Sequence, residues 1–189
     1  MDRCIHIDYK ITRYPDKVVI TESTDQTGID DNNISDYNSY YYSIQAFNSD
    51  GEGGRATSNK VGVGNPFTVP YSCTFETDAD FNKWTVIDAN QDKVTWIHYM
   101  KTAQYNYSST NSGDDWLISP PVTLEKGKAY KVSFDVLTGG MPEKLKVTFG
   151  KDDTAEGQAV VLDEATYSSQ DVIRKTVYLP ENIEKMLIG

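Results

Sequence analysis

The chain has 189 residues, of which 18 are Lys or Arg and 28 are Asp or Glu, so its formal net charge is −10 at pH 7. This acidity argues against nucleic acid and anionic membrane as partners, because both need a basic surface. The length allows one large domain or two modest ones, and no apolar run is long enough to span a membrane. The 13 tyrosines favour strands over helices.

Alternating patterns predict a first unit over residues 1–64. A half-buried strand is expected where Ile5, Ile7, Tyr9 and Ile11 alternate with polar residues, and a short return strand over 18–21 after a turn at 14–17. A longer alternating run covers 39–48. A loop at 49–54 then leads to a last strand over 56–63.

Three motifs of this unit follow one another in a familiar order: Y-K-I-T-R from Tyr9, I-S-D-Y-N-S-Y-Y-Y-S-I-Q-A-F-N-S-D-G-E-G from Ile34, and S-N-K-V-G-V from Ser58. They resemble the third to last strands of a fibronectin type III domain. The resemblance implies that the Tyr40 hydroxyl bonds back to the backbone of the preceding crossover, as in a tyrosine corner. The family's first two strands would precede Ile5, so we expect this chain to be a fragment.

A Gly- and Pro-containing boundary at 62–66 introduces a second unit. Trp116, Ile118, Pro120, Val122 and Leu124 share one face of an alternating run, and Tyr130, Val132, Phe134 and Val136 share a face of the next. We expect two neighbouring strands with this face on the core. The two prolines should mark a strand end, since they lack amide donors. Further strands are expected at 145–149, 160–162 and 172–179 and from 186 onward, with a weak helical turn near 180–185.

The run D-D-W-L-I-S-P-P-V-T-L from Asp114, then G-K-A-Y-K-V-S-F-D-V from Gly127, resembles the cleaved-adhesin or choice-of-anchor J domains. Phe75-Glu76, Trp84 and D-A-N-Q-D-K-V-T-W from Asp88 fit that family's opening. These are MAM-like jelly rolls of secreted and surface proteins of bacteria, including the haemagglutinin-adhesin regions of gingipains. The resemblance implies an all-β chain of two tandem β-sandwiches: a partial fibronectin type III unit (1–64) and a jelly roll (67–189) that lacks its closing strands.

One candidate metal site stands out. Asp88, Asn90 and Asp92 place three oxygen-bearing side chains at alternate positions, which suits calcium. Compared with an EF-hand loop, Lys93 stands where glycine is needed and Tyr99 where glutamate is needed. The resemblance implies a structural calcium with Glu76 as a further ligand, in a loop that often has glycine where Gln91 and Lys93 stand here. The alternative is a solvated, metal-free turn.

The polar tract from Thr102 to Gly113, rich in Ser, Asn and Tyr, predicts a long surface loop. Tyr105, Asn106 and Tyr107, together with Tyr99, are the candidate ligand-binding residues, because Tyr beside Asn and Ser is typical of adaptable binding surfaces. The alternative is that the tyrosine rings fold back onto the sandwich. We expect Trp116 in the core, because it shares a face with Ile118 and Val122.

No catalytic pattern is present: there is no nucleophile elbow, phosphate-binding loop, dinucleotide fingerprint or zinc spacing, and we expect His6 and His98 to be surface or packing residues. Cys4 and Cys73 fall in different units, and we expect them to be unpaired or to pair with segments outside this chain. The implied function is a non-catalytic adhesion module, a monomeric segment of a larger extracellular or cell-surface bacterial protein that binds host protein or glycan. Two alternatives remain: an accessory region of a secreted hydrolase such as a peptidase, or a structural spacer.

Overall fold

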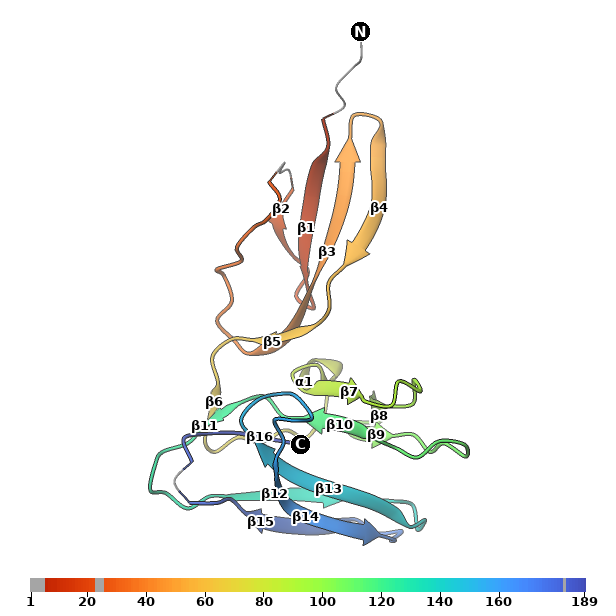
Figure 1. Ribbon diagram of the computed structural model, residues 1–189, viewed down its shortest axis with the longest axis vertical. Helices are drawn as coiled ribbons and strands as arrows, with labels where there is room; N and C mark the ends of the chain where they lie inside the picture. Colours follow the sequence, from red (N-terminus) through yellow and green to blue (C-terminus); the bar gives the residue numbers. More distant parts are fainter. Residues whose placement is uncertain (1–5, 23–25, 182) are drawn as a thin grey trace. The chain divides into compact units, whose positions relative to one another are not determined.

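The computed structural model describes residues 6–22, 26–181 and 183–189, and these residues are nearly all β (Figure 1). The predicted all-β fold class is therefore confirmed. The chain divides into two compact units, Met1–Asn65 and Pro66–Gly189. In the described residues the one α-helix is α1 (Asp78–Phe81), where the sequence predicted none, and the described part of 180–185 has a turn at Glu181 but no helix. No helix in the described ranges has the length and apolar character needed to cross a membrane.

The first unit is one antiparallel sheet (Figure 1). Its strands run in the order β2 (Val18–Thr21), β1 (Asp8–Tyr14), β3 (Asn38–Asn48) and β4 (Gly51–Thr57), and β5 (Val61–Val63) pairs with the first part of β3. The expected strand over 56–63 is thus two strands. Ser58 explains the break: its Oγ accepts the Tyr42 amide at 2.9 Å and its own amide donates to the Tyr42 carbonyl, which ends β4 at Thr57.

Alternation gives this sheet two different faces. Tyr9, Ile11 and Arg13 of β1 lie opposite Ala46, Ile44 and Tyr42 of β3, so these side chains share one face. Ile11 is buried, as its alternation predicted, while Ile44 beside it is 42% exposed. Ile5, expected to begin this strand, lies outside the described residues.

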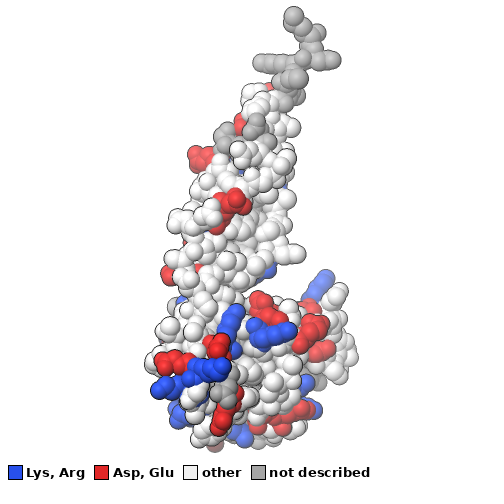
Figure 2. Space-filling model, turned by 60° about the vertical axis from the view of Figure 1, so that its left-hand side comes forward, with Lys and Arg blue, Asp and Glu red and all other residues white. Residues whose placement is uncertain are grey.

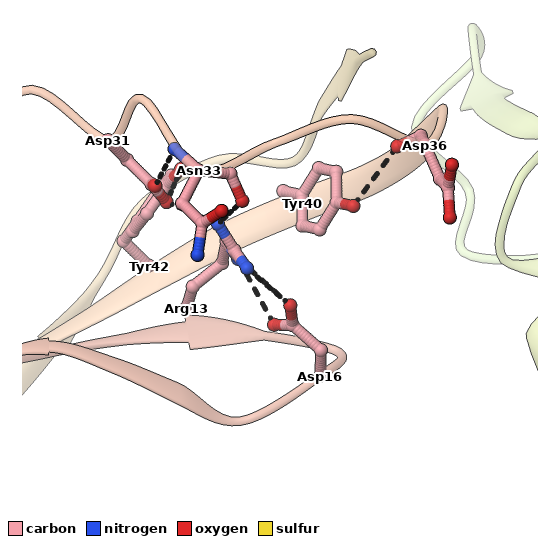
Figure 3. Close-up of polar contacts among 7 residues, drawn as sticks. All are labelled: Arg13, Asp16, Asp31, Asn33, Asp36, Tyr40 and Tyr42. Carbon is pink, nitrogen blue, oxygen red and sulfur yellow. Dashed lines mark hydrogen bonds and ion pairs between the residues drawn. The ribbon is translucent and has the colours of Figure 1, made fainter. Parts of the chain in front are cut away.

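A buried arginine ties the crossover between β2 and β3 to this face (Figure 3). Arg13 is 4% exposed, and its guanidinium donates to both Asp16 and Asp31, with 2.8 Å from Nη1 to Asp31 Oδ2. It also donates to the Asn33 carbonyl, and Tyr42 donates to Asp31. The Tyr40 hydroxyl donates to the Asp36 carbonyl at 3.1 Å, which confirms the expected bond back to the crossover.

The second unit is built around two facing layers. One is the sheet β14 (Val160–Tyr167), β13 (Glu143–Gly150), β16 (Lys185–Ile188), β11 (Val122–Thr123) and β6 (Phe67–Thr68); the other is β12 (Lys131–Val136) with β15 (Ile173–Tyr178). Val122, Leu124, Leu179 and Met186 are buried together, with Val132 of β12 and Phe149 of β13 packed against them. Side chains of both layers therefore form one core.

Two antiparallel strand pairs complete this unit: β10 (Asp115–Ile118) with β7 (Thr85–Asp88), and the hairpin of β8 (Trp96–Tyr99) with β9 (Thr102–Tyr105). The prediction that the strands around Pro120 and around Phe134 are neighbours was wrong. The two prolines end β10 and precede β11, as expected, but β11 pairs with β16 and β6 while β12 pairs with β15. Pro120 and Pro121 have no backbone N–H to donate, so strand pairing is interrupted there, and the chain passes from its pairing with β7 to its pairing with β16 and β6.

Candidate functional site

The β8–β9 hairpin positions the predicted ligand-binding residues. Its register pairs Trp96 with Tyr105 and Tyr99 with Thr102, so Tyr105 stands at the open end and Tyr99 at the turn. The tract from Thr102 to Gly113 is therefore not all loop: its first four residues form β9. The structure consequently divides the predicted set, with Tyr105, Asn106 and Tyr107 at one end of the hairpin and Tyr99 at the other.

At the open end two loops are joined by hydrogen bonds; we call residues 89–95 and 106–114 the paired loops. Asn111 Nδ2 donates to Asp92 Oδ2 at 2.9 Å, and Asn90 Nδ2 donates to the Ser112 carbonyl at 3.0 Å. The Ala89 amide donates to the Asp114 carbonyl at 3.2 Å. These hydrogen bonds join residues about twenty positions apart, so each loop fixes the position of the other.

The first of the paired loops is itself a hydrogen-bonded turn. Asp88 accepts the amides of Asp92 and Lys93, Asn90 Oδ1 accepts the Asp92 amide, and Asp92 Oδ1 accepts the Val94 amide at 2.8 Å. These are Asx-type turns, in which a side-chain oxygen replaces a backbone acceptor. The pKa of Asp92 lies below its usual value, because the Val94 amide and then Asn111 stabilise its charged form. Gln91 and Lys93 have φ of 58° and 68°, which explains why glycine would suit both positions.

The predicted calcium ligands Asp88, Asn90 and Asp92 all belong to this hydrogen-bond network. Each side-chain oxygen of Asp88, Asn90 and Asp92 already accepts a hydrogen bond from an N–H group, whereas calcium needs six to eight oxygen ligands around one point. Across residues 6–22, 26–181 and 183–189, no group of three or more His, Cys, Asp or Glu side chains is placed to hold a metal ion. Glu76 instead pairs with Lys101 at the hairpin turn, at 2.8 Å. The hydrogen bonds account for the turn without a metal, and calcium binding stays a prediction.

Tyr105 and Tyr107 differ sharply in environment. The Tyr105 ring packs edge-on against Trp96, with 5.7 Å between centroids, and its hydroxyl donates to Asp115 Oδ2 at 3.0 Å. Gly113 lies so close that a Cβ there would come within 2.9 Å of the Tyr105 hydroxyl. Burial, and then the bond to Asp115, raise the pKa of Tyr105 to about 12. Tyr107, two residues on, is 79% exposed.

Tyr99, Asn106 and Trp116 lie at the turn of the hairpin, at its open end and in β10, respectively. Tyr99 is 49% exposed and Met100 is 76% exposed at the turn, where Met100 and Lys101 have φ of 48° and 61°. Asn106 is exposed and its Oδ1 accepts a bond from Gln104. Trp116 is half-buried with the Lys146 ammonium 5.9 Å from its ring centre, so it lies at the margin of the core rather than inside it.

The two histidines and Cys73 lie outside the paired loops. His6 lies 3.3 Å from Asp8, and His98 is held between Asp78 and the Phe75 carbonyl, a contact that no sequence pattern indicated. Cys73 is a free thiol beside Tyr71, and burial raises the pKa of Tyr71 above its usual range. Cys4 lies outside the described residues, so its pairing stays a prediction.

Comparisons with known proteins add no relative: no family model, no curated protein and no solved structure matches the chain.

Proposed function

We propose that this chain is a non-catalytic binding module of a larger secreted or cell-surface bacterial protein, and that the paired loops around Tyr107 contact its ligand, a host protein or a glycan. The observation that carries the proposal is an aromatic side chain, 79% exposed, on a loop that its neighbours hold in place. Tyrosine supplies contact area at low entropic cost, and a fixed loop loses little further freedom on binding.

Hydrogen bonds hold the loop on the C-terminal side of Tyr107. The Asn111 amide donates to Ser108 Oγ at 3.1 Å, and the Asn111 side chain reaches Asp92 of the neighbouring loop. Asn90 holds the Ser112 carbonyl. Around Tyr107, the exposed Asn106, Ser109 and Thr110 offer hydrogen-bonding groups that either a protein or a sugar could use.

The charge of the chain also supports a protein or glycan ligand. The net charge of −10 disfavours a nucleic acid partner, and Figure 2 shows acidic and basic side chains interspersed on the visible face of the second unit, in the lower part of the picture. Both ring nitrogens of His98 are engaged by oxygen atoms, which leaves neither free to act as a catalytic base.

The test uses the whole chain on arrays of glycans and extracellular host proteins, with Tyr107→Ala as the variant. Tyr178→Ala is the matched control, because Tyr178 is also largely exposed, at 75%, but lies on β15 in another sheet. We expect Tyr107→Ala to lose most of the retention at an unchanged melting temperature, and Tyr178→Ala to keep it. Equal retention by wild type and Tyr107→Ala would place the binding surface elsewhere, and a wild-type chain that binds nothing would contradict the proposed function.

A further inference from the structure

His98 of β8 bridges two oxygen acceptors that belong to the chain before and within α1. Its Nδ1 lies 2.5 Å from Asp78 Oδ1 and its Nε2 lies 2.8 Å from the Phe75 carbonyl oxygen. Its side chain is 16% exposed, whereas that of Asp78 is 86% exposed. The His98 ring also stacks on Phe81, with 6.1 Å between centroids.

Neither acceptor can donate a hydrogen bond to the ring: a carboxylate at neutral pH and a backbone carbonyl only accept. A neutral imidazole carries one N–H and one lone pair, so it can satisfy one of the two and must turn its lone pair toward the other. The doubly protonated ring donates to both. The charged form of His98 is thus the form that makes both hydrogen bonds.

The surrounding charges also favour the protonated form of His98. The pKa of His98 is raised above its usual value of 6.5 by the hydrogen bond to Asp78 first and by that to the Phe75 carbonyl second, and the negative charges of Asp78 and Asp80 in α1 raise it further. The nearest described cation on the hairpin, Lys101, is paired with Glu76, and Lys83 is paired with Asp80. The residue opposite His98 on β9, Ala103, carries no charge.

The clamped segment is strained. Phe75 has φ of 54°, a left-handed conformation that is costly for a bulky side chain, and this conformation goes with the carbonyl that His98 holds. The Phe75 ring packs on Trp84 and Phe81, at 5.1 Å and 6.2 Å between centroids. Beyond these ring contacts, His98 and the Glu76–Lys101 ion pair are the polar links between this strained segment and the hairpin. The ion pair is exposed and therefore contributes little.

We propose that His98 is a pH-sensitive latch, which in its charged form fastens α1 and residues 75–78 to β8 and on losing its proton releases them. Asp78, being exposed, can turn to water once the ring no longer donates to it. Asp80 of the released segment lines a cavity of about 350 Å³, together with Tyr71 and Cys73, so access to this cavity follows the latch.

Because the folded pKa of His98 is raised, the latch is fully closed below pH 6.5 and opens as the pH rises through the folded value. Hydrogen exchange of the amides of residues 75–83, corrected for intrinsic rates, measures this directly. We expect protection to fall by up to about tenfold per pH unit above the folded pKa of His98. In His98→Gln protection should be low and independent of pH, and His6→Gln, the control, should keep the wild-type profile.

A wild-type profile without pH dependence would overturn the latch, and so would a His98→Gln profile that changes with pH as the wild type does. Nitrogen NMR of the histidine rings measures the protonation state of His98 without any variant. At pH 6.5, where an ordinary imidazole is half neutral, we expect His98 to carry protons on both ring nitrogens. A neutral His98 ring at that pH contradicts the proposal even if the variant fails to fold.

Discussion

The Tyr105 hydroxyl donates to Asp115 Oδ2 at 3.0 Å and so joins the end of β9 to the start of β10. The other carboxylate oxygen, Asp115 Oδ1, is buried without a hydrogen-bond partner. The Tyr105 hydroxyl and the Asp114 amide, which donates at 3.3 Å, are thus the donors that satisfy this carboxylate. Tyr105 therefore supports the paired loops, while Tyr107 extends from them.

The first prediction separates these two tyrosines by stability. Tyr105→Phe should lower the free energy of unfolding by about 1–3 kcal/mol, because it leaves the part-buried Asp115 carboxylate with only the long bond from the Asp114 amide. Tyr105→Ala also removes the packing on Trp96 and should cost about 2–4 kcal/mol. Tyr107→Ala should change stability by less than about 0.5 kcal/mol. Urea unfolding measures all three, and a large loss for Tyr107→Ala would mean that its ring is structural.

The second prediction is an alkaline transition. Since the folded pKa of Tyr105 is raised to about 12, its stabilising contribution is complete below pH 10 and is lost as the pH rises toward 12. Tyrosinate absorbance should show a late-titrating group that Tyr105→Phe removes. Tyr167, whose pKa burial and Asp163 also raise to about 12, should remain in that variant and provides the internal control.

Some of this arrangement could be predicted from the sequence and some could not. Local alternation identified the strands that bury Ile118, Val122 and Leu124, because a period of two is a property of neighbouring residues. Which strand pairs with which depends on distant segments, and the partner of β12 was predicted wrongly for that reason. The same limit applies to the site. The Asp-Asn-Asp spacing identified a turn rich in side-chain oxygens, but its partners, Asn111 and Ser112, come from a loop about twenty residues on.

The third prediction concerns Arg13. Asp31 has a side chain only 9% exposed, and burial alone would raise its pKa, but the bond from Arg13 and other donors lower it overall. Arg13→Met leaves this carboxylate without its cation and should destabilise the first unit by about 3–5 kcal/mol. Arg13→Met with Asp31→Asn should recover part of the loss, and Arg55→Met, at an exposed arginine of the same sheet, should have little effect.

The same pair gives the first unit an acid sensitivity. Because the folded pKa of Asp31 is lowered below 3.8, its contribution is present above that pH and is lost as the pH falls through the folded value. In Asp31→Asn, acid unfolding of this unit should lose that component. An unchanged acid transition would show that the Arg13 network does not hold the crossover.

The fourth prediction uses the strained turn of the β8–β9 hairpin. Met100 and Lys101 are both left-handed, as a two-residue turn of type I′ requires, and Asn-Gly is the sequence that adopts it at least cost. Met100→Asn with Lys101→Gly should raise the free energy of unfolding by about 1 kcal/mol, since the lost pair with Glu76 is exposed and worth little. Met100→Ala, which cannot relieve the strain, is the control. A destabilised double variant would indicate that the turn residues make contacts beyond the hairpin.

The last prediction decides between the hydrogen-bonded turn and the calcium site. Asp88, Asn90 and Asp92 already accept N–H donors, so we expect the same melting temperature in excess calcium and in chelator. A ligand that binds only the folded state would raise stability by about 2.7 kcal/mol at a hundredfold excess over its dissociation constant, which such melts readily resolve. A melting temperature that rises with calcium in the wild type but not in Asp88→Asn would establish the calcium site. Glu125→Gln, at an exposed glutamate elsewhere in the unit, is the control and should keep the rise. Retention of the rise in Asp88→Asn would mean that calcium binds at other residues.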